Sequence, residues 1–177
     1  CQAQKAKLRR DLVRLNHLEQ IETTLNSYQD NFDKYPTLGA GTFIRSMSNS
    51  RWPSWDATLG STLGVPLPKD PINRFAQGCD TASGYDPATC WNEKSQSYRC
   101  PQGSHIYQYE SFGGAQTKVR MEFELLERSV SIPFWDVDQW VPGITGDVIT
   151  QTSGWCNWQT VNPNRGSWSN GSPICGN

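Results

Sequence analysis

The sequence predicts an α+β fold, in which one long N-terminal α-helix packs on an antiparallel β-sheet of three or four strands. Residues 1–33 form a helical pattern that no proline or glycine interrupts. Two segments of alternating polarity, "SHIYQYES" and "TKVRMEFELLE", lie within residues 104–128 and are joined by the turn "FGGAQ". Each of these strands has one apolar face, and the apolar stripe of the helix is the natural partner for that face.

The predicted helix carries an apolar stripe at steps of three and four residues. Its members are Leu8, Leu12, Leu15, Leu18, Ile21 and Leu25. At about 1.5 Å per residue the helix would be roughly 45–50 Å long, which exceeds the depth of a small domain. We therefore expect one end of it to project.

The two ends of this helix have different chemistry. The first residues hold the basic side chains Lys5, Lys7, Arg9 and Arg10. This cluster indicates either a solvated helix end or a segment that lies just outside a membrane. At the other end Asp30, Asn31 and Asp33 favour a turn, and Pro36 cannot continue a helix.

Residues 34–103 are predicted to be an irregular connection between the helix and the strands. The stretch "LPKDPINRF" has the chemistry of a turn, and "TCWNEKSQSYRC" is consistent with a hairpin. Residues 129–177 differ in composition, because tryptophans are interleaved there with Gly, Pro, Asn, Ser and Thr. The chain thus divides into a core of residues 1–128 and a Trp-rich extension of residues 129–177.

The six cysteines favour disulfides in an oxidising compartment over a zinc site. None of their spacings is that of a zinc ribbon, and the chain has only two histidines. We predict that Cys156 pairs with Cys175, and that Cys90 pairs with Cys100 across a hairpin. Cys79 would then be free, pair with Cys1, or bond elsewhere.

Few features indicate catalysis, and we predict that the protein is not an enzyme. The common nucleophile, phosphate-loop and metalloprotease motifs are absent from the sequence, and Glu122 and Glu124 share one strand face that we interpret as solvated. Asp136, Asp138 and Asp147 suit a calcium site, but we favour ordinary loop capping and solvation as their role. No other cofactor is expected.

Charge and aromatic content limit the partners. The net charge is −1, so nothing indicates a nucleic acid. No apolar run is long enough to span a membrane. The tryptophans Trp155, Trp158 and Trp168 either fill a small second core or form a surface for a glycan or a protein partner.

The order of these pieces resembles the type II secretion major pseudopilin G and related type IV pilin-like proteins. The matching positions are Tyr28, Asp30, Asn31, Tyr35 and Pro36, then Leu67, Pro68, Lys69, Asp70, Pro71 and Asn73, then Tyr107 and Tyr109. The sequence departs from the family where Ile72 is followed directly by Asn73 in place of a Trp-Gly pair. The region between Cys79 and Cys100 is an insertion, and the Trp-rich extension replaces the usual acidic end with its calcium site.

The resemblance implies a structural subunit of a type IV pilus or a type II secretion pseudopilus, which assembles through the apolar stripe of its helix. Its partners would be copies of itself, other pilins and the inner-membrane assembly machinery. It would be anchored in the membrane before assembly and extracellular afterwards. An apolar helix half would precede Cys1, unless Cys1 is a lipidated N-terminus. The alternative is a minor pilin or adhesin that binds a partner with its Trp-rich extension.

Overall fold

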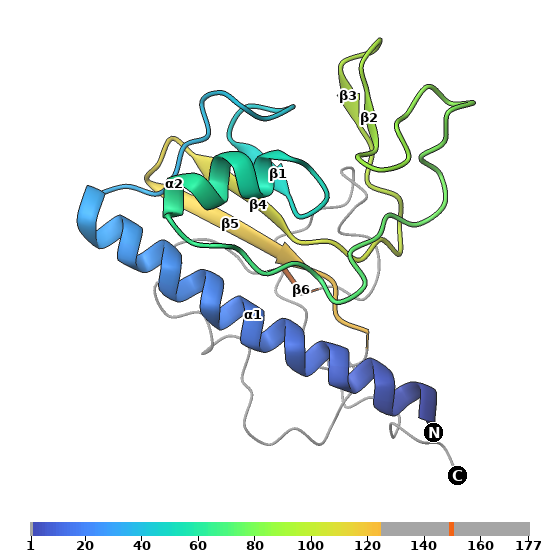
Figure 1. Cartoon of the computed structure of the whole chain (residues 1–177), viewed down its shortest axis with the longest axis horizontal. Coiled ribbons are helices and arrows are strands. Elements are labelled where there is room, and N and C mark those ends of the chain that lie inside the picture. Colours follow the sequence, from blue (N-terminus) through green and yellow to red (C-terminus); the bar gives the residue numbers. More distant parts are fainter. Residues whose placement is uncertain (1, 125–148, 151–177) are drawn as a thin grey trace.

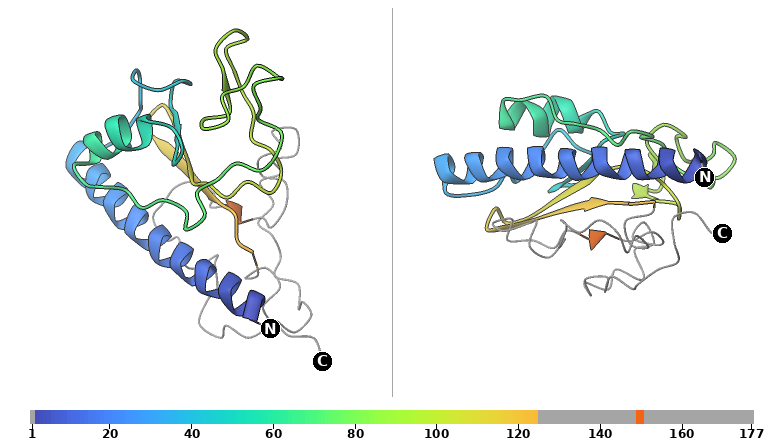
Figure 2. Two further views of the ribbon diagram at one scale, coloured as in Figure 1. Left: turned by 45° about the vertical axis from the view of Figure 1, so that its right-hand side comes forward. Right: turned by 90° about the horizontal axis from the view of Figure 1, so that it is seen from below.

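One long helix lies across a small four-stranded sheet in a computed structural model that describes residues 2–124 and 149–150 (Figure 1). Helix α1 spans Gln2–Phe32. The sheet contains β1 (Met47–Asn49), β4 (Gln108–Phe112), β5 (Gln116–Met121) and β6 (Ile149–Thr150), in the order β1-β4-β5-β6. Seen from below, the helix covers one face of the sheet (Figure 2). The chain is therefore an α+β protein, as the sequence predicts.

Helix α1 ends where the sequence predicts, at the cluster of turn-forming side chains. The side-chain Nδ2 of Asn31 donates to the backbone carbonyl of Ser27 at 2.8 Å, and Asp33 takes a left-handed conformation with φ of 55°. Short polar side chains tolerate this conformation better than most, so Asp33 can reverse the chain direction. Pro36 follows in extended structure and prevents a further turn of helix.

The hairpin β4–β5 closes on the chain that leaves the helix. Its register pairs Tyr109 with Val119 and Phe112 with Gln116. Gly114, at φ of 82°, accepts a 2.8 Å hydrogen bond from the amide of Tyr35. A Cβ atom on Gly114 would lie 3.1 Å from the Thr37 side chain, so glycine permits both the turn and this close approach.

The connection between helix and hairpin is more ordered than predicted. β1 pairs antiparallel with β4 and extends the sheet at one edge. A helical stretch follows, with a π-helical part η1 at Trp55–Gly60 and one α-helical turn α2 at Ser61–Leu63. These elements are too short for their periodicity to stand out in the sequence.

The other edge of the sheet departs from a purely antiparallel arrangement, because β6 pairs with β5 in parallel. A parallel neighbour requires a connection of a dozen residues or more, and β6 follows β5 by more than that. A two-residue strand so far along the chain leaves no alternation that sequence analysis could detect.

The core lies between α1 and the apolar face of the sheet. It is formed by Leu15, Leu18, Ile21, Leu25, Tyr35, Leu38, Trp55, Leu59, Leu67, Tyr107, Tyr109, Val119, Met121 and Phe123. The opposite face of the sheet is also buried, since Arg120 is 4% exposed and Glu122 is 2% exposed. The prediction of a solvated face is therefore wrong for Glu122, and also for Glu124, whose side chain is 9% exposed. Alternating polarity identifies the two faces of a strand but does not reveal whether a second layer covers the polar one.

A small second hairpin carries the cysteines. It consists of β2 (Trp91–Asn92) and β3 (Ser97–Tyr98), with Trp91 opposite Tyr98. The disulfide joins Cys79 to Cys90, so the predicted pairing of Cys90 with Cys100 is wrong. Cys90 precedes β2 and has a left-handed conformation with φ of 51°, so it does not continue the extended strand to a cross-strand position opposite Cys100. Cys79, Cys90 and Cys100 all lie in one buried cluster with Phe75 and Ile106. Cys100 is also disulfide-bonded.

Candidate functional site

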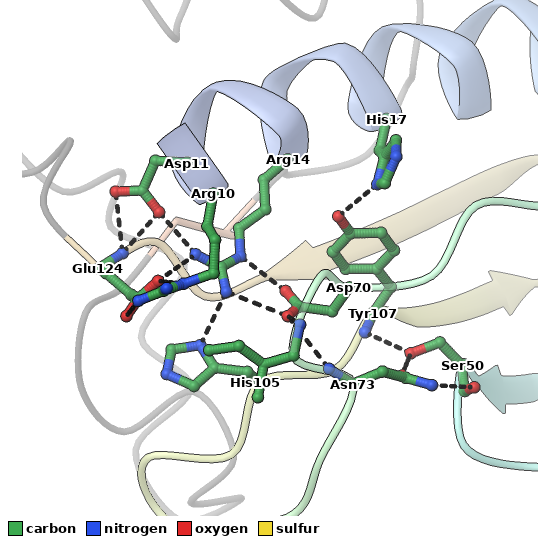
Figure 3. A network of polar contacts seen from close by, with 11 residues as sticks. Arg10, Asp11, Arg14, His17, Ser50, Asp70, Asn73, His105, Tyr107 and Glu124 are labelled. Atoms are coloured by element: carbon green, nitrogen blue, oxygen red, sulfur yellow. Dashed lines mark hydrogen bonds and ion pairs between the residues drawn. The ribbon is translucent and has the colours of Figure 1, made fainter. Parts of the chain in front are cut away.

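A buried network of ion pairs joins α1 to the rest of the fold, and Arg14 is its centre (Figure 3). The side chain of Arg14 is fully buried. Its Nε donates to Asp70 Oδ2 at 2.6 Å, and its Nη1 donates to Asp11 Oδ1 at 2.7 Å and to Glu124 Oε2 at 3.0 Å. Its Nη2 donates to Asp70 Oδ1 at 3.0 Å. All three guanidinium nitrogens are thus bound to carboxylates.

Asp70 brings the loop of "LPKDPINRF" into this network. Its Oδ1 also accepts a hydrogen bond from the amide of Ile72 at 2.8 Å, which closes the turn locally. Asn73, three residues further on, accepts a 2.6 Å hydrogen bond from the hydroxyl of Ser50, and Ser50 Oγ accepts one from the amide of Tyr107 at 2.9 Å. A continuous set of bonds therefore runs from the helix through this loop to the sheet.

Glu124, just after β5, contributes the third carboxylate. Arg10 binds it in a bidentate manner, with Nε to Oε2 at 2.6 Å and Nη2 to Oε1 at 2.7 Å. The backbone amide of Glu124 donates to Asp11 Oδ1 at 2.8 Å. Burial raises the pKa of Glu124, but the hydrogen bonds from Arg10 and Arg14 outweigh it and hold this pKa at about 2. The carboxylate is therefore charged at all physiological pH values.

Two histidines lie at the edge of the network. His105 Nδ1 is 3.4 Å from Arg14 Nη2, and His17 Nδ1 shares a 2.9 Å hydrogen bond with the hydroxyl of Tyr107. Burial lowers the pKa of both histidines, and the charge of Arg14 lowers the pKa of His105 further. Both rings are consequently favoured in the neutral form, in which His105 can accept a hydrogen bond from Arg14.

The network predicts how stability depends on pH. His17 and His105 have lowered pKa values in the folded state, so their contribution is lost as pH falls below about 6.5, the unfolded value. The carboxylate of Glu124 contributes above its unfolded pKa and loses that contribution as pH falls toward about 2. We expect the free energy of unfolding, measured by urea denaturation, to fall between neutral pH and pH about 2. Glu124→Gln should reduce the slope of that fall below pH about 4.5, and an unchanged slope would contradict this assignment.

The predicted assembly stripe of α1 is only partly in the core. Leu15, Leu18, Ile21 and Leu25 are at most 2% exposed, and Leu8 packs at the edge of the core. Leu12 is 42% exposed. Because a helix has 3.6 residues per turn, the side of α1 that faces the core includes Asp11 and Arg14, and Leu12 lies outside it.

Sequence analysis missed Asp11 and Arg14 as site residues. Their position in the sequence could have identified them. Asp11 and Arg14 are opposite charges three residues apart, and helical spacing places them on the same core-facing side as Leu18, Ile21 and Leu25. The sequence pattern indicates a turn residue and a position of the pilin-like resemblance at Asp70, and a solvated residue at Glu124, but it does not indicate that either carboxylate binds Arg14.

The remaining predicted site residues lie outside the part of the chain that the structure describes. They are Cys156 and Cys175, Asp136, Asp138 and Asp147, and Trp155, Trp158 and Trp168. Within residues 2–124 and 149–150, no cluster of three or more His, Cys, Asp or Glu side chains has the arrangement of a metal site. In the same residues, no helix has the length and apolar character needed to cross a membrane.

The side of α1 that points away from the sheet is a second feature of the site, which we call the outer face. It consists of the exposed residues Lys5, Arg9, Leu12, Val13, Asn16, Gln20, Thr23 and Ser27. The adjacent aliphatic side chains Leu12 and Val13 are 42% and 41% exposed and lie together on this face. The arrangement is suited to holding a helix rigidly on a sheet while one of its faces stays available for a partner.

Comparison with known protein families, characterised proteins and solved structures found no match to this chain.

Proposed function

We propose that this protein is a structural subunit of a filament of the type IV pilus or type II secretion pseudopilus kind, with a pilin-like fold. The observation that carries the proposal is the 31-residue helix α1, which buries one face on an antiparallel hairpin and exposes the other over its whole length. In an isolated protein an exposed pair such as Leu12 and Val13 has no packing role. In a filament the same outer face would contact the helices of neighbouring subunits.

The buried network supports this function mechanically. A subunit that transmits force along a filament must keep its helix fixed to its globular part. Arg14 attaches α1 to Asp70 in the loop and to Glu124 beyond the hairpin, so the helix is held at two places far apart in sequence. Removing one partner of a buried ion pair leaves an uncompensated buried charge, so loss of Arg14 should destabilise the contact between the helix and the rest of the fold.

The disulfide between Cys79 and Cys90 supports an exported location, because such bonds persist mainly in oxidising compartments. We propose that the protein is held in the membrane before assembly and is extracellular in the filament. Its partners would be copies of itself, other pilins and the assembly machinery. The alternative role as an adhesin concerns tryptophans outside the described residues.

The test is immunogold electron microscopy of cells that produce the full-length protein, with antibodies against this chain. We expect gold particles along filaments and loss of those filaments in the variant Leu12→Asp/Val13→Asp. The control is Phe112→Asp, which places one acidic charge, against two in the outer-face variant, on a side chain that is 50% exposed at the hairpin tip. Unchanged thermal unfolding of the purified variants would show that the fold is retained. Labelling confined to the cell envelope, or filaments unaffected by the outer-face variant, would refute the proposal.

A further inference from the structure

The charges of α1 are ordered opposite to what helix stability favours. Residues 2–10 carry four basic side chains and no acidic one, and residues 15–33 carry Glu19, Glu22, Asp30 and Asp33 and no basic one. The first turn has no acidic residue and the last turn has no basic one. The helix macrodipole is positive at the N-terminus and favours the reverse order. The distribution therefore needs an explanation outside the helix itself.

Most of these charges have no ion-pair partner within the described part of the chain. Arg10 binds Glu124, but Lys5 and Arg9 are exposed and form no ion pair with residues 2–124. The same holds for Glu19 and Glu22 in the acidic half. Partial burial, together with the neighbouring charge of Glu19, raises the pKa of Glu22. Within residues 2–124 and 149–150, Glu19 and Glu22 thus have no cation paired with them.

A groove lies beside the acidic half of the helix. It has a volume of about 420 Å³ and is lined by Asn16, Glu19, Gln20, Thr23 and Thr24 of α1 and by Val65, Pro66, Leu67 and Pro68 of the loop after α2. Val65 is 39% exposed, so the loop side of the groove presents an apolar surface. The groove therefore combines one carboxylate, several hydrogen-bonding side chains and an apolar wall.

We propose that this groove receives the N-terminal part of α1 from a second copy of the chain, with Arg9 or Lys5 of that copy bound to Glu19. The proposal rests on the filament function proposed above and specifies the contact between subunits. In parallel helices, an offset of ten to fourteen residues, about 15–21 Å along the axis, brings Arg9 or Lys5 level with Glu19. At the smaller offset Leu12 and Val13 of the second copy lie near the apolar wall.

Both halves of the contact are complementary in charge and in polarity. The basic end supplies cations for Glu19 and Glu22, which form no ion pair among the described residues, and the exposed aliphatic pair meets Val65. Complementary potentials of this kind fix the register of an interface more than they raise its affinity. The inverted charge order of α1 would then set the axial spacing between subunits. Anionic lipid headgroups are a different occupant for Lys5 and Arg9, but they leave the acidic groove unexplained.

The experiment is a charge swap in the whole 177-residue chain. Self-association of the purified protein at low salt is measured by sedimentation velocity for Arg9→Glu, Glu19→Lys and the double variant. We expect each single variant to weaken self-association by about tenfold or more, because like charges then face each other, and the double variant to restore it. High salt should also weaken self-association of the unmodified protein, since salt screens the attraction between solvent-exposed charges. Lys94→Glu changes the net charge as Arg9→Glu does, at an exposed turn far along the chain, and should have no effect.

Three outcomes would overturn the contact. In the first, the single variants associate like the unmodified protein. In the second, the double variant stays impaired. In the third, Arg9→Glu reduces only the binding of the protein to phosphatidylglycerol vesicles and leaves self-association unchanged. The same variants in cells separate this proposal from the filament function. Filaments that persist in all charge variants would leave the function intact and refute the contact. A charge swap that works in solution, without any labelled filament in cells, would support the contact and refute the filament.

Discussion

Replacing Arg14 by methionine is expected to destabilise the protein by about 3–5 kcal/mol, because it leaves buried carboxylates without their cation. Asp11 and Asp70 have fully buried side chains, and a carboxylate oxygen of each is 2.7 Å or less from a guanidinium nitrogen of Arg14. Methionine preserves much of the volume of the arginine stem, so the loss reports charge and hydrogen bonding more than packing. The measurement is urea denaturation at neutral pH, with the free energy of unfolding extrapolated to water.

Arg10 provides the matched control for this substitution. It belongs to the same helix and binds the same Glu124, but its side chain is 32% exposed. Arg10→Met should cost no more than about 1 kcal/mol, as is usual for ion pairs that water reaches. If Arg14→Met costs as little as Arg10→Met, the buried network does not hold the helix on the sheet.

Leu18→Ala is expected to cost about 2–5 kcal/mol, whereas Leu12→Ala, six residues earlier in the same helix, should cost less than about 0.5 kcal/mol. Leu18 is 0% exposed in the core between α1 and the sheet, and Leu12 is 42% exposed. Both substitutions remove the same atoms and raise helix propensity equally, so their difference isolates burial. Urea denaturation of the two variants gives the comparison directly.

The pair also separates stability from assembly. Leu12→Ala should leave the free energy of unfolding unchanged but weaken self-association if the outer face contacts a second copy. Equal costs for the two substitutions would mean that α1 is buried on both sides, and the proposed assembly face would then not exist.

Several elements of the fold could be predicted from the sequence because their information is local. The apolar spacing of residues 8–25 and the turn residues at the end of the helix set the length of α1. The alternation of apolar and polar residues on both sides of two adjacent glycines predicts the hairpin β4–β5 and its turn. In each case the pattern of neighbouring residues is itself the physical cause of the element, through helical or extended periodicity.

The buried network is a different case, because its members are far apart in the sequence. Arg14 and Asp70 are separated by 56 residues, and Arg14 and Glu124 by 110. Each of the three is an ordinary surface residue by type, and only their convergence makes it favourable to bury them. Asp11 and Arg14 on the core-facing side of the stripe were a local sign of this, but they did not identify the partners.

By itself the sequence thus determined the class of fold, the long helix, the central hairpin and the presence of disulfides. Only the tertiary structure decided that Cys90 bonds Cys79, that the polar face of the sheet is buried, and that Arg14 faces the core while Leu12 faces solvent. The physical reason is that backbone periodicity depends on neighbouring residues. Burial, ion pairing and disulfide pairing depend on which distant segments meet, and that is fixed only when the whole chain has packed.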